Sequence, residues 1–258
     1  MRPPTPLSAM KLVVVSGASR GIGLEFASQL LRRSQDTHVV AASRSGADSP
    51  GIAGLQAEFP ERLAAIECDV TRPDHISQLG HRVKELHADK KVDLLLNVAG
   101  LLHDAGGSGY MPERSLSTID ADAMSRVLAT NAIGPVLVSQ ALASRMNRGA
   151  IIGNLSARVG SISDNRLGGW WSYRMSKAAL NMATVNMALE LKRREVYAVA
   201  LHPGTTDTSL SVPFQKNVRP EKLFTTEYTV SSLLSVLDGL QPEDTGGFFA
   251  FDGSKIEF

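Results

Sequence analysis

Ser16-Gly17-Ala18-Ser19-Arg20-Gly21-Ile22-Gly23 joins an apolar run over 11–16 to an amphipathic run over 22–33. Its glycines allow a tight turn and a close approach of a ligand to the backbone. The helix that begins there presents free amide groups and the positive end of its dipole to a pyrophosphate. Because the required strand and helix flank the turn, a dinucleotide site is favoured over an ordinary strand-to-helix turn. Its expected contact residues are Gly17, Ser19, Arg20, Gly21, Ile22 and Gly23.

Short β-branched runs alternate with longer amphipathic runs along the rest of the chain. The pattern predicts strands over 11–16, 38–43, 63–70, 92–97, 150–156, 196–202 and 247–251. It predicts helices over 22–33, 54–59, 71–88, 121–146, around Tyr173 to about 194, and over 227–240. Gly134 and Pro135 are expected to bend the helix over 121–146. Such alternation implies parallel strands joined by right-handed helical crossovers. The fold class is therefore α/β, with one Rossmann-type domain over 10–258, a doubly wound parallel seven-stranded sheet and helices on both faces.

The 258-residue chain has 27 basic and 26 acidic side chains, hence a net charge of +1. This balance argues against nucleic-acid binding and against attraction to an anionic membrane surface, so a small molecule is the expected partner. Cys68 is the only cysteine, which excludes an intrachain disulfide and favours a reducing, cytoplasmic compartment. No apolar run approaches the ~18 residues that a membrane span needs. Residues 1–9 are expected to form a flexible leader, with a trimmed targeting remnant as the alternative.

Tyr173-Arg174-Met175-Ser176-Lys177 is a candidate catalytic stretch, with Ser156 upstream of it. In a helix, residues four apart share a face, so the phenol and the ammonium would lie side by side. An unperturbed tyrosine titrates near pH ~10, and a nearby cation favours its phenolate. We therefore expect Lys177 to lower the pKa of Tyr173 into a range useful for proton transfer. Taken alone, the same spacing also arises by chance on solvated helix faces.

The glycine turn, Asn97-Val98-Ala99-Gly100, Ser156, and Tyr173 with Lys177 occur in an order that resembles the short-chain dehydrogenase/reductase family, from Lys11 to Gly253. Within that family, the stretches over 169–181 and 202–208 are similar to the C-factor branch, which contains sniffer-like carbonyl reductases. The chain end, Ile256-Glu257-Phe258, departs from the Ile-Pro-Trp expected in that branch.

The resemblance implies roles for four catalytic residues. Ser156 would hydrogen-bond the substrate carbonyl and its developing oxyanion, and Tyr173 would donate the proton while NADPH delivers hydride to carbon. Lys177 would hold the ribose hydroxyls as well as acting on Tyr173. Asn131, a poor helix former in mid-helix, would bend its helix and hold a water in a proton relay to Lys177.

The resemblance also implies a set of cofactor contacts beyond the glycine turn. Asp69 would contact the adenine, although a turn residue at a strand end is nearly as good an interpretation. Thr206 and Thr208 would hold the nicotinamide amide and the phosphates. The remaining expected cofactor residues are Val70, Asn97, Ala99, Gly100, Tyr173, Lys177, Pro203 and Gly204.

The choice between NADP and NAD depends on the end of the second strand, which reads Ala41-Ala42-Ser43-Arg44. NAD-preferring folds place a carboxylate there to accept from the ribose hydroxyl, and this chain has none. The planar donors of Arg44, helped by Arg20, suit a 2′-phosphate. NADP(H) is therefore favoured over NAD(H), with two solvated arginines on a rim as the alternative.

Loops over about 101–119, 157–170 and 205–224 are expected to shape the substrate site. Apolar side chains there could wall a pocket for a carbonyl or alcohol substrate, although core packing is an alternative for each one: Leu101, Leu102, Met111, Val159, Trp170, Trp171 and Phe214. The histidines show no metal-ligand spacing, so no metal is expected. By resemblance, a homodimer or homotetramer would form through the helices that contain Asn131 and Tyr173. The second hypothesis is a cofactor-binding signalling protein of the C-factor kind in which catalysis is incidental.

Overall fold

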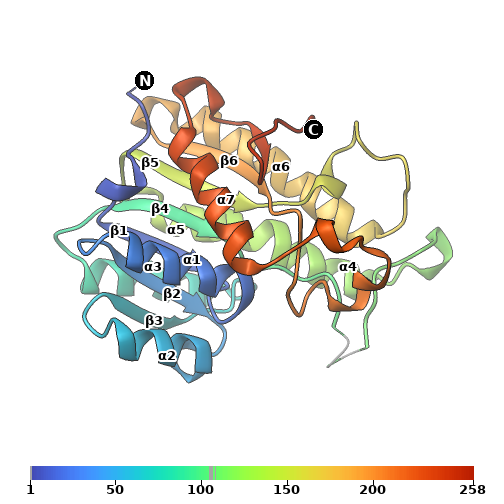
Figure 1. Ribbon diagram of the computed structural model, residues 1–258, viewed down its shortest axis with the longest axis horizontal. Helices are drawn as coiled ribbons and strands as arrows, with labels where there is room; N and C mark the ends of the chain where they lie inside the picture. Colours follow the sequence, from blue (N-terminus) through green and yellow to red (C-terminus); the bar gives the residue numbers. More distant parts are fainter. Residues whose placement is uncertain (1, 105–106, 108) are drawn as a thin grey trace.

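A seven-stranded parallel sheet forms the centre of the computed structural model, which describes residues 2–104, 107 and 109–258. The strands lie in the order β3-β2-β1-β4-β5-β6-β9 (Figure 1). Their bounds are β1 Leu12–Ser16, β2 His38–Ser43, β3 Leu63–Glu67, β4 Val92–Asn97, β5 Met146–Leu155, β6 Tyr197–His202 and β9 Phe248–Ala250. The predicted doubly wound α/β fold is confirmed, because the chain order reverses direction in the sheet between β1 and β4.

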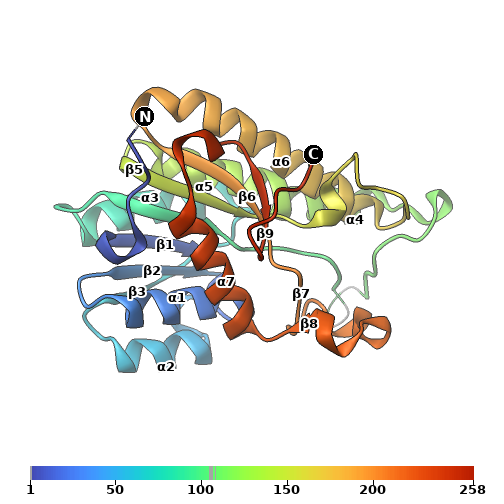
Figure 2. The same cartoon turned by 45° about the horizontal axis from the view of Figure 1, so that its top comes forward.

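Helices cover both faces of the sheet, as Figure 2 shows for α1 and α2 on one side and α6 on the other. One layer consists of α1 Gly21–Arg33, α2 Pro50–Glu58 and α7 Thr226–Gly239. The other layer consists of α3 Pro73–Leu86, α4 Ala121–Leu128, α5 Gly134–Ala143 and α6 Trp171–Leu191. Successive side chains of β1 alternate between the two cores, so Val13 and Val15 pack with α1 and α7 while Leu12 and Val14 pack with α3 and α5.

The helix predicted over 121–146 is interrupted directly before Gly134 and Pro135, in the turn that contains Asn131, the residue expected to bend it. A π-helical turn, Ala129–Ile133, separates α4 from α5, which ends at Ala143 and not near 146. Pro135 has no N–H to donate to the carbonyl four residues before it, so the regular ladder is interrupted there. The wider turn buries the Asn131 side chain completely.

Several other boundaries differ from the sequence prediction, among them the start of α2, which lies at Pro50 and not at 54. β3 ends at Glu67, not at 70, and β5 begins at Met146, not at 150. The early start of β5 pairs Met146 with Val92 before the register shifts. Residues 1–9 were expected to form a flexible leader, but Leu7 is buried and the Thr5 N–H donates to the Gly149 carbonyl at 2.9 Å.

The first expected substrate loop contains residues 105–106 and 108, which lie outside the described residues. The third contains two short paired strands, β7 Thr205–Thr206 and β8 Leu223–Phe224. Within the described part of the chain, no helix is long and apolar enough to cross a membrane. Among the same residues, no three His, Cys, Asp or Glu side chains are placed together so that they could hold a metal ion.

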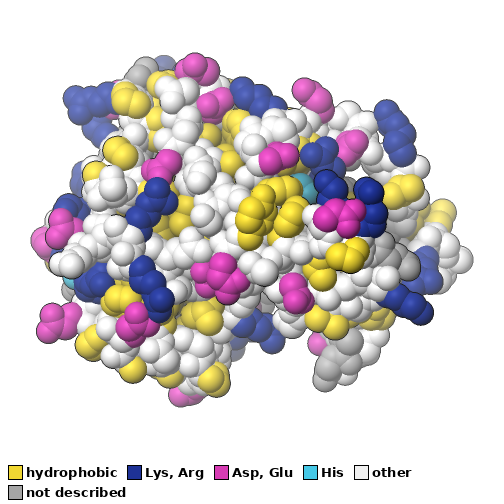
Figure 3. All heavy atoms as spheres, viewed as in Figure 1, with side chains coloured by type: hydrophobic (Ala, Val, Ile, Leu, Met, Phe, Trp, Pro, Cys, Tyr) yellow, Lys and Arg dark blue, Asp and Glu magenta, His cyan; other side chains and the backbone are white. Residues whose placement is uncertain are grey.

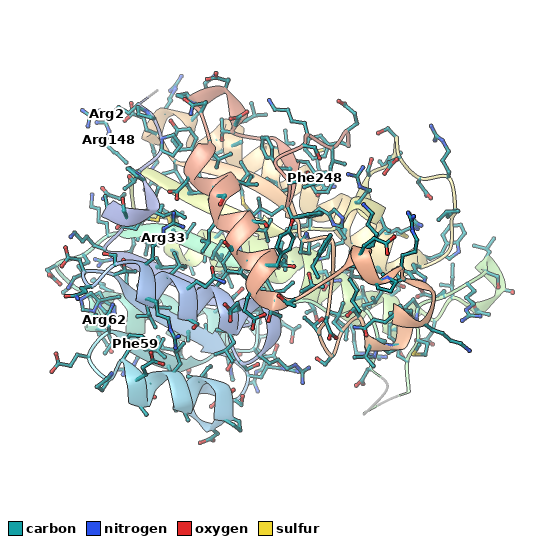
Figure 4. The ribbon with its side chains drawn as sticks, viewed as in Figure 1. Arg2, Arg33, Phe59, Arg62, Arg148 and Phe248 are labelled. Carbon is teal, nitrogen blue, oxygen red and sulfur yellow. The ribbon has the colours of Figure 1, made fainter. Side chains whose placement is uncertain are left out.

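The surface carries interspersed charges of both signs over the face shown in Figure 3. Arg33 of α1 pairs with Asp238 of α7, and the Arg62 guanidinium lies 4.8 Å from the centre of the Phe59 ring. Figure 4 labels Arg33, Phe59 and Arg62 on the half of the molecule built from the first three strands. The first of these contacts joins α1 to α7, and the second lies within the segment that connects α2 to β3.

Candidate active site

The glycine turn lies at the carboxyl end of β1, against the segment that follows β4. Gly17 has a φ of +76°, and a Cβ on it would be 2.6 Å from the Ala99 backbone nitrogen. A Cβ on Gly23 would be 2.2 Å from the Gly17 carbonyl oxygen. Both positions therefore require glycine, and the turn is folded closely enough to expose the amides at the start of α1. This cradle fits a dinucleotide pyrophosphate.

Tyr173 and Lys177 lie one turn apart on the buried face of α6, as predicted. Their side chains are 8% and 4% exposed. The Lys177 ammonium donates to the Leu155 carbonyl at 2.7 Å, at the carboxyl end of β5. It also lies 4.0 Å from the position of a Cβ on Gly100, so the segment after β4 reaches the same point. The helix thus delivers both side chains to the edge of the sheet where the glycine turn lies.

The electrostatics of this pair differ from the expectation that Lys177 lowers the pKa of Tyr173. Burial raises the pKa of the Tyr173 phenol, because a phenolate loses its hydration there. Burial also lowers the pKa of Lys177 to about 7. The ammonium faces the Tyr173 ring at 5.6 Å from its centre. Desolvation therefore dominates both groups, and it keeps the phenol protonated in this structure.

Ser156 follows β5 directly and is buried beside α6. Its backbone N–H donates to the Leu201 carbonyl at 2.7 Å, which fixes the residue to the end of β6. Its hydroxyl donates to the Asn181 side-chain oxygen at 2.6 Å. Asn181 is four residues after Lys177, so Tyr173, Lys177 and Asn181 form one helix face that meets Ser156.

Asn131 lies in the π-helical turn, where its side chain bonds to the segment after β4. It accepts from the Leu101 N–H at 2.7 Å and donates to the Leu101 carbonyl at 2.8 Å. Its amide also donates to the Ser176 hydroxyl at 3.0 Å. Asn131 therefore connects the turn, the first substrate loop and α6, beside Lys177.

The candidate adenosine side lies at the ends of β2 and β3. Arg20 and Arg44 are both exposed. Asp69 accepts from the N–H and the hydroxyl of Thr71 at 2.9 and 2.7 Å, as a turn residue does. Burial alone would raise the pKa of Asp69, but these bonds and the charge of Arg44 outweigh it and lower that pKa. A Cβ on Gly134 would be 2.8 Å from the Val70 carbonyl oxygen, so the segment after β3 lies against the start of α5.

Among the other expected cofactor residues, Asn97, Thr206 and Thr208 make side-chain contacts at this edge of the sheet, and the rest would offer their backbone to the cofactor. Asn97 is buried and donates to the Asn154 side-chain oxygen at 2.8 Å, which crosslinks β4 to β5. The Thr206 hydroxyl shares a 2.9 Å hydrogen bond with Thr229 of α7. The Thr208 methyl lies 3.3 Å from the position of a Cβ on Gly21, over the glycine turn. Backbone positions at this edge of the sheet are Ser19, Ile22, Ala99, Gly100, Pro203 and Gly204.

An aromatic wall, made of His103, Trp170 and Phe214, joins the three expected substrate loops beside Tyr173. The Trp170 ring lies edge-on to Tyr173 at 6.2 Å and packs on Phe214 at 4.9 Å. The His103 ring lies 5.8 Å from Phe214. The other apolar candidates do not share one environment, since Leu102 is buried, Leu101 and Val159 are half-buried, and Met111 and Trp171 are exposed.

The sequence interpretation missed three residues of this region. Asn181 could have been found, because it continues the Tyr173 and Lys177 face at the same spacing. A Cβ on Gly160 would be 2.6 Å from the Lys177 Cβ, so a glycine lets the loop after Ser156 reach α6. Glu113 is a buried carboxyl at the start of α6, and nothing local in its sequence marks it.

Comparisons with known proteins agree with this geometry. A family model described as short chain dehydrogenase matches residues 11–219. A 1-hydroxy-2-glutathionyl-2-methyl-3-butene dehydrogenase of Rhodococcus is 32% identical, covering 96% of this chain and all of the relative. The C-signal protein of Myxococcus xanthus is 35% identical, covering 60% of this chain and 90% of the relative. An NADPH-bound carbonyl reductase from chicken fatty liver superposes with a TM-score of 0.85 at 30% identity, covering 96% of this chain and 99% of that one. The chain therefore belongs to the short-chain dehydrogenase/reductase family of oxidoreductases, which bind a nicotinamide cofactor.

Proposed function

We propose that this protein is an NADPH-dependent oxidoreductase that reduces a ketone or aldehyde to an alcohol, or catalyses the reverse reaction. The observation that carries this proposal is the convergence of Ser156, Tyr173 and Lys177 at the carboxyl end of β5. A serine, a phenol and a lysine are buried together there, beside a glycine turn that fits a pyrophosphate. The solved chicken relative is described as an NADPH-bound carbonyl reductase, which supports the same reaction class.

The side chains have complementary roles in the proposed reaction. A bound nicotinamide cofactor supplies the hydride that reaches the carbonyl carbon. Tyr173 is protonated at neutral pH, because burial raises its pKa, and it gives its proton to the carbonyl oxygen as the alcohol forms. The pKa of Lys177, lowered to about 7, allows this residue to exchange protons near neutral pH and to help reprotonate the phenol. Ser156 stabilises the developing oxyanion when its hydroxyl turns from Asn181 to the substrate.

Residues at the end of β2 support a preference for NADP(H). Arg44 and Arg20 are exposed, so their guanidinium groups are available to a 2′-phosphate. The buried Ser43 hydroxyl has no hydrogen-bond partner among the described residues, which suits a site completed by a polar ligand. The end of β2, Ala41 to Arg44, contains no carboxylate that would repel the phosphate.

The experiment that tests the reaction is NADPH consumption with a panel of aldehydes, quinones and ketones, with NADH as the cofactor control. We expect turnover with NADPH that Tyr173→Phe abolishes, since phenylalanine keeps the ring but removes the proton. A Tyr173→Phe protein that turns over as fast as the parent would refute the catalytic assignment.

The cofactor preference has a separate test in Arg44→Ala. Loss of a charge-assisted phosphate contact of ~1.5–3 kcal/mol should lower NADPH affinity roughly 10- to 100-fold and leave NADH affinity within about twofold. Arg32→Ala is the matched control, because Arg32 pairs with Glu58 on the outer side of α1. Equal losses for both cofactors would show that Arg44 does not read the 2′-phosphate.

A cofactor-binding signalling role is the second proposal, favoured by the similarity to the Myxococcus C-signal protein. A binding protein has no need of a buried serine, tyrosine and lysine together, so the enzyme is the better-supported proposal. Tight NADPH binding without turnover of any panel member would favour the signalling role.

Homo-oligomer formation is proposed through the helices that contain Asn131 and Tyr173. Apolar side chains on these helices are exposed in the single chain, namely Ile133, Val136, Met175, Met182 and Leu189. Light scattering in solution should give a dimer or tetramer mass. A monomer at micromolar concentration would refute this proposal.

A further inference from the structure

Glu113 is a buried carboxylate to which the proposed reaction gives no role. Its side chain is 3% exposed, in the first substrate loop between β4 and α4. Buried carboxylates are rare unless they are paired or hydrogen-bonded. Among the residues that the structure describes, no lysine or arginine forms an ion pair with Glu113. Its partners are three neutral donors.

Two of these donors belong to the first turn of α6. One Glu113 oxygen accepts from the Ser172 N–H at 3.1 Å, and the other accepts from the Ser172 hydroxyl. The Tyr110 hydroxyl is the third donor, at 3.2 Å. The carboxylate therefore lies at the positive end of the helix dipole and joins the loop to the residue that precedes Tyr173.

The backbone of Glu113 makes a second connection to the same helix. Its carbonyl accepts from the Trp170 N–H at 2.5 Å. Trp170 is the residue before α6, and it has a left-handed φ of +50° with no side-chain cap of its own. That conformation is unfavourable for a residue with a side chain and persists only where neighbouring contacts impose it. Glu113 supplies both the missing cap and the backbone partner.

These contacts of Glu113 affect the substrate side through the rings of Trp170 and Tyr173. The position of Trp170 sets the aromatic wall, since its ring lies against both Tyr173 and Phe214. Tyr173 lies in the first turn of α6, so the position of that turn determines the position of the Tyr173 hydroxyl. We propose that Glu113 is a positioning residue, whose carboxylate couples the first substrate loop to the start of α6 and so holds Trp170 and Tyr173 in place for the substrate. This role rests on the proposed function, because Tyr173 must be the proton donor for its position to matter to turnover.

Glutamine is a structurally compatible replacement, which separates position from charge. In Glu113→Gln the side chain carries no charge, but its amide oxygen can accept from the Ser172 N–H. Its NH₂ group can then donate to the hydroxyls of Ser172 and Tyr110, since a hydroxyl also accepts. Glu113→Ala removes all of these bonds and leaves the Ser172 N–H without its side-chain acceptor.

The test compares Glu113→Ala, Glu113→Gln and Arg114→Ala in steady-state kinetics with the best carbonyl substrate. Arg114 is the adjacent, exposed residue and serves as the control. A displacement near 1 Å at a catalytic group costs about 100-fold, so Glu113→Ala should lower kcat/KM roughly 10- to 100-fold. Its dissociation constant for NADPH should stay within twofold of the parent's. Glu113→Gln and Arg114→Ala should both stay within about threefold of the parent.

A second readout is independent of turnover. Trp170 and Trp171 are the only tryptophans, so Trp171→Phe makes Trp170 the sole tryptophan and reports its environment. In that background, Glu113→Ala should make the fluorescence about twofold more quenchable by acrylamide, and Glu113→Gln should not. If the parent turns over no substrate, the proposed reaction fails, while the quenching result still tests the coupling.

Three results would overturn the proposal. Parental kinetics and quenching in Glu113→Ala would show that the coupling has no effect. A Glu113→Gln protein as impaired as Glu113→Ala would show that position is not what matters. If Glu113→Ala raised the NADPH dissociation constant by the same factor as it lowered kcat/KM, the substitution would have disturbed the whole site and not the positions of Trp170 and Tyr173 alone. If Glu113→Ala does not fold, Ser172→Ala removes one bond only and should lower kcat/KM about threefold to tenfold, with parental values refuting the role.

Discussion

Gly23→Ala is the substitution for which the structure gives the clearest expected effect. A Cβ at this position would be 2.2 Å from the Gly17 carbonyl oxygen and 2.9 Å from the Gly17 carbonyl carbon, whereas real Cβ atoms stay beyond 3.0 Å. Both partners are backbone atoms, so no side chain can rotate away. The start of α1 must therefore move from the glycine turn by about 0.8 Å.

Two measurements follow from that displacement. Overpacking of this kind costs ~1–3 kcal/mol, which urea unfolding should record as a lower free energy of unfolding. The amides at the start of α1 would also lose their alignment to the pyrophosphate. Loss of one such charge-assisted hydrogen bond, ~1.5–3 kcal/mol, should weaken NADPH binding at least tenfold in a fluorescence titration.

Gly54→Ala is the matched control for Gly23→Ala. Gly54 lies in α2, where a Cβ would have nothing within 4 Å. Alanine is a better helix former than glycine by ~0.8–1.0 kcal/mol, so this variant should be slightly more stable and bind NADPH like the parent. The reasoning fails if Gly23→Ala binds NADPH within twofold of the parent, or if both variants lose stability equally.

Three further substitutions test the electrostatics and a helix end. Asp120→Ala removes the cap that accepts from the Ala123 N–H at 2.7 Å, so urea unfolding should show a loss of ~1 kcal/mol, and an unchanged midpoint would contradict the cap. Burial lowers the pKa of Lys177 to about 7, which means that burying its charged form costs stability. Lys177→Met should therefore raise the free energy of unfolding at pH 7 by ~2–4 kcal/mol. The same variant should abolish turnover. The gain in stability should shrink as the pH rises towards 10.5, and equal stability at pH 7 would contradict the pKa. Burial also lowers the pKa of His202 from 6.5 to about 4, so unfolding takes up a proton between these pH values. As the pH falls through this range, the free energy of unfolding of the parent should drop by up to about 3 kcal/mol more than that of His202→Gln, as parallel urea titrations would show.

The sequence predicted those parts of the fold that depend on local pattern. The strands over 38–43 and 92–97 have the predicted ends, because each is a short apolar run between polar turns. Pro135 marks the interruption of the helix near Asn131 locally, whereas the contacts that bury Asn131 are not local. Asn131 bonds to Leu101 and Ser176, which only the folded chain brings close to it.

The candidate site shows the same division. Tyr173 and Lys177 share a buried face as their spacing predicts, yet the pKa of Tyr173 moves in the direction opposite to the expected one. The spacing of the two residues in the sequence gives the distance between the phenol and the ammonium. Their burial depends on which other parts of the chain cover them, and the effect of this desolvation on the pKa of Tyr173 is larger than that of the nearby charge. Glu113 was missed for the same reason, because a carboxyl in a loop has no sequence sign that it caps a helix more than 50 residues later.

The central place of β1 also bears on how the chain is made. When β1 to β3 have left the ribosome, β1 is paired on one side only, and its other edge stays open until β4 is synthesised. An open edge on a strand as apolar as Leu12–Ser16 is a template for aggregation. Each later strand, β4, β5, β6 and β9, closes the edge before it and presents a new one. During synthesis the growing sheet therefore always presents one unpaired apolar edge on this side, until β9 completes it.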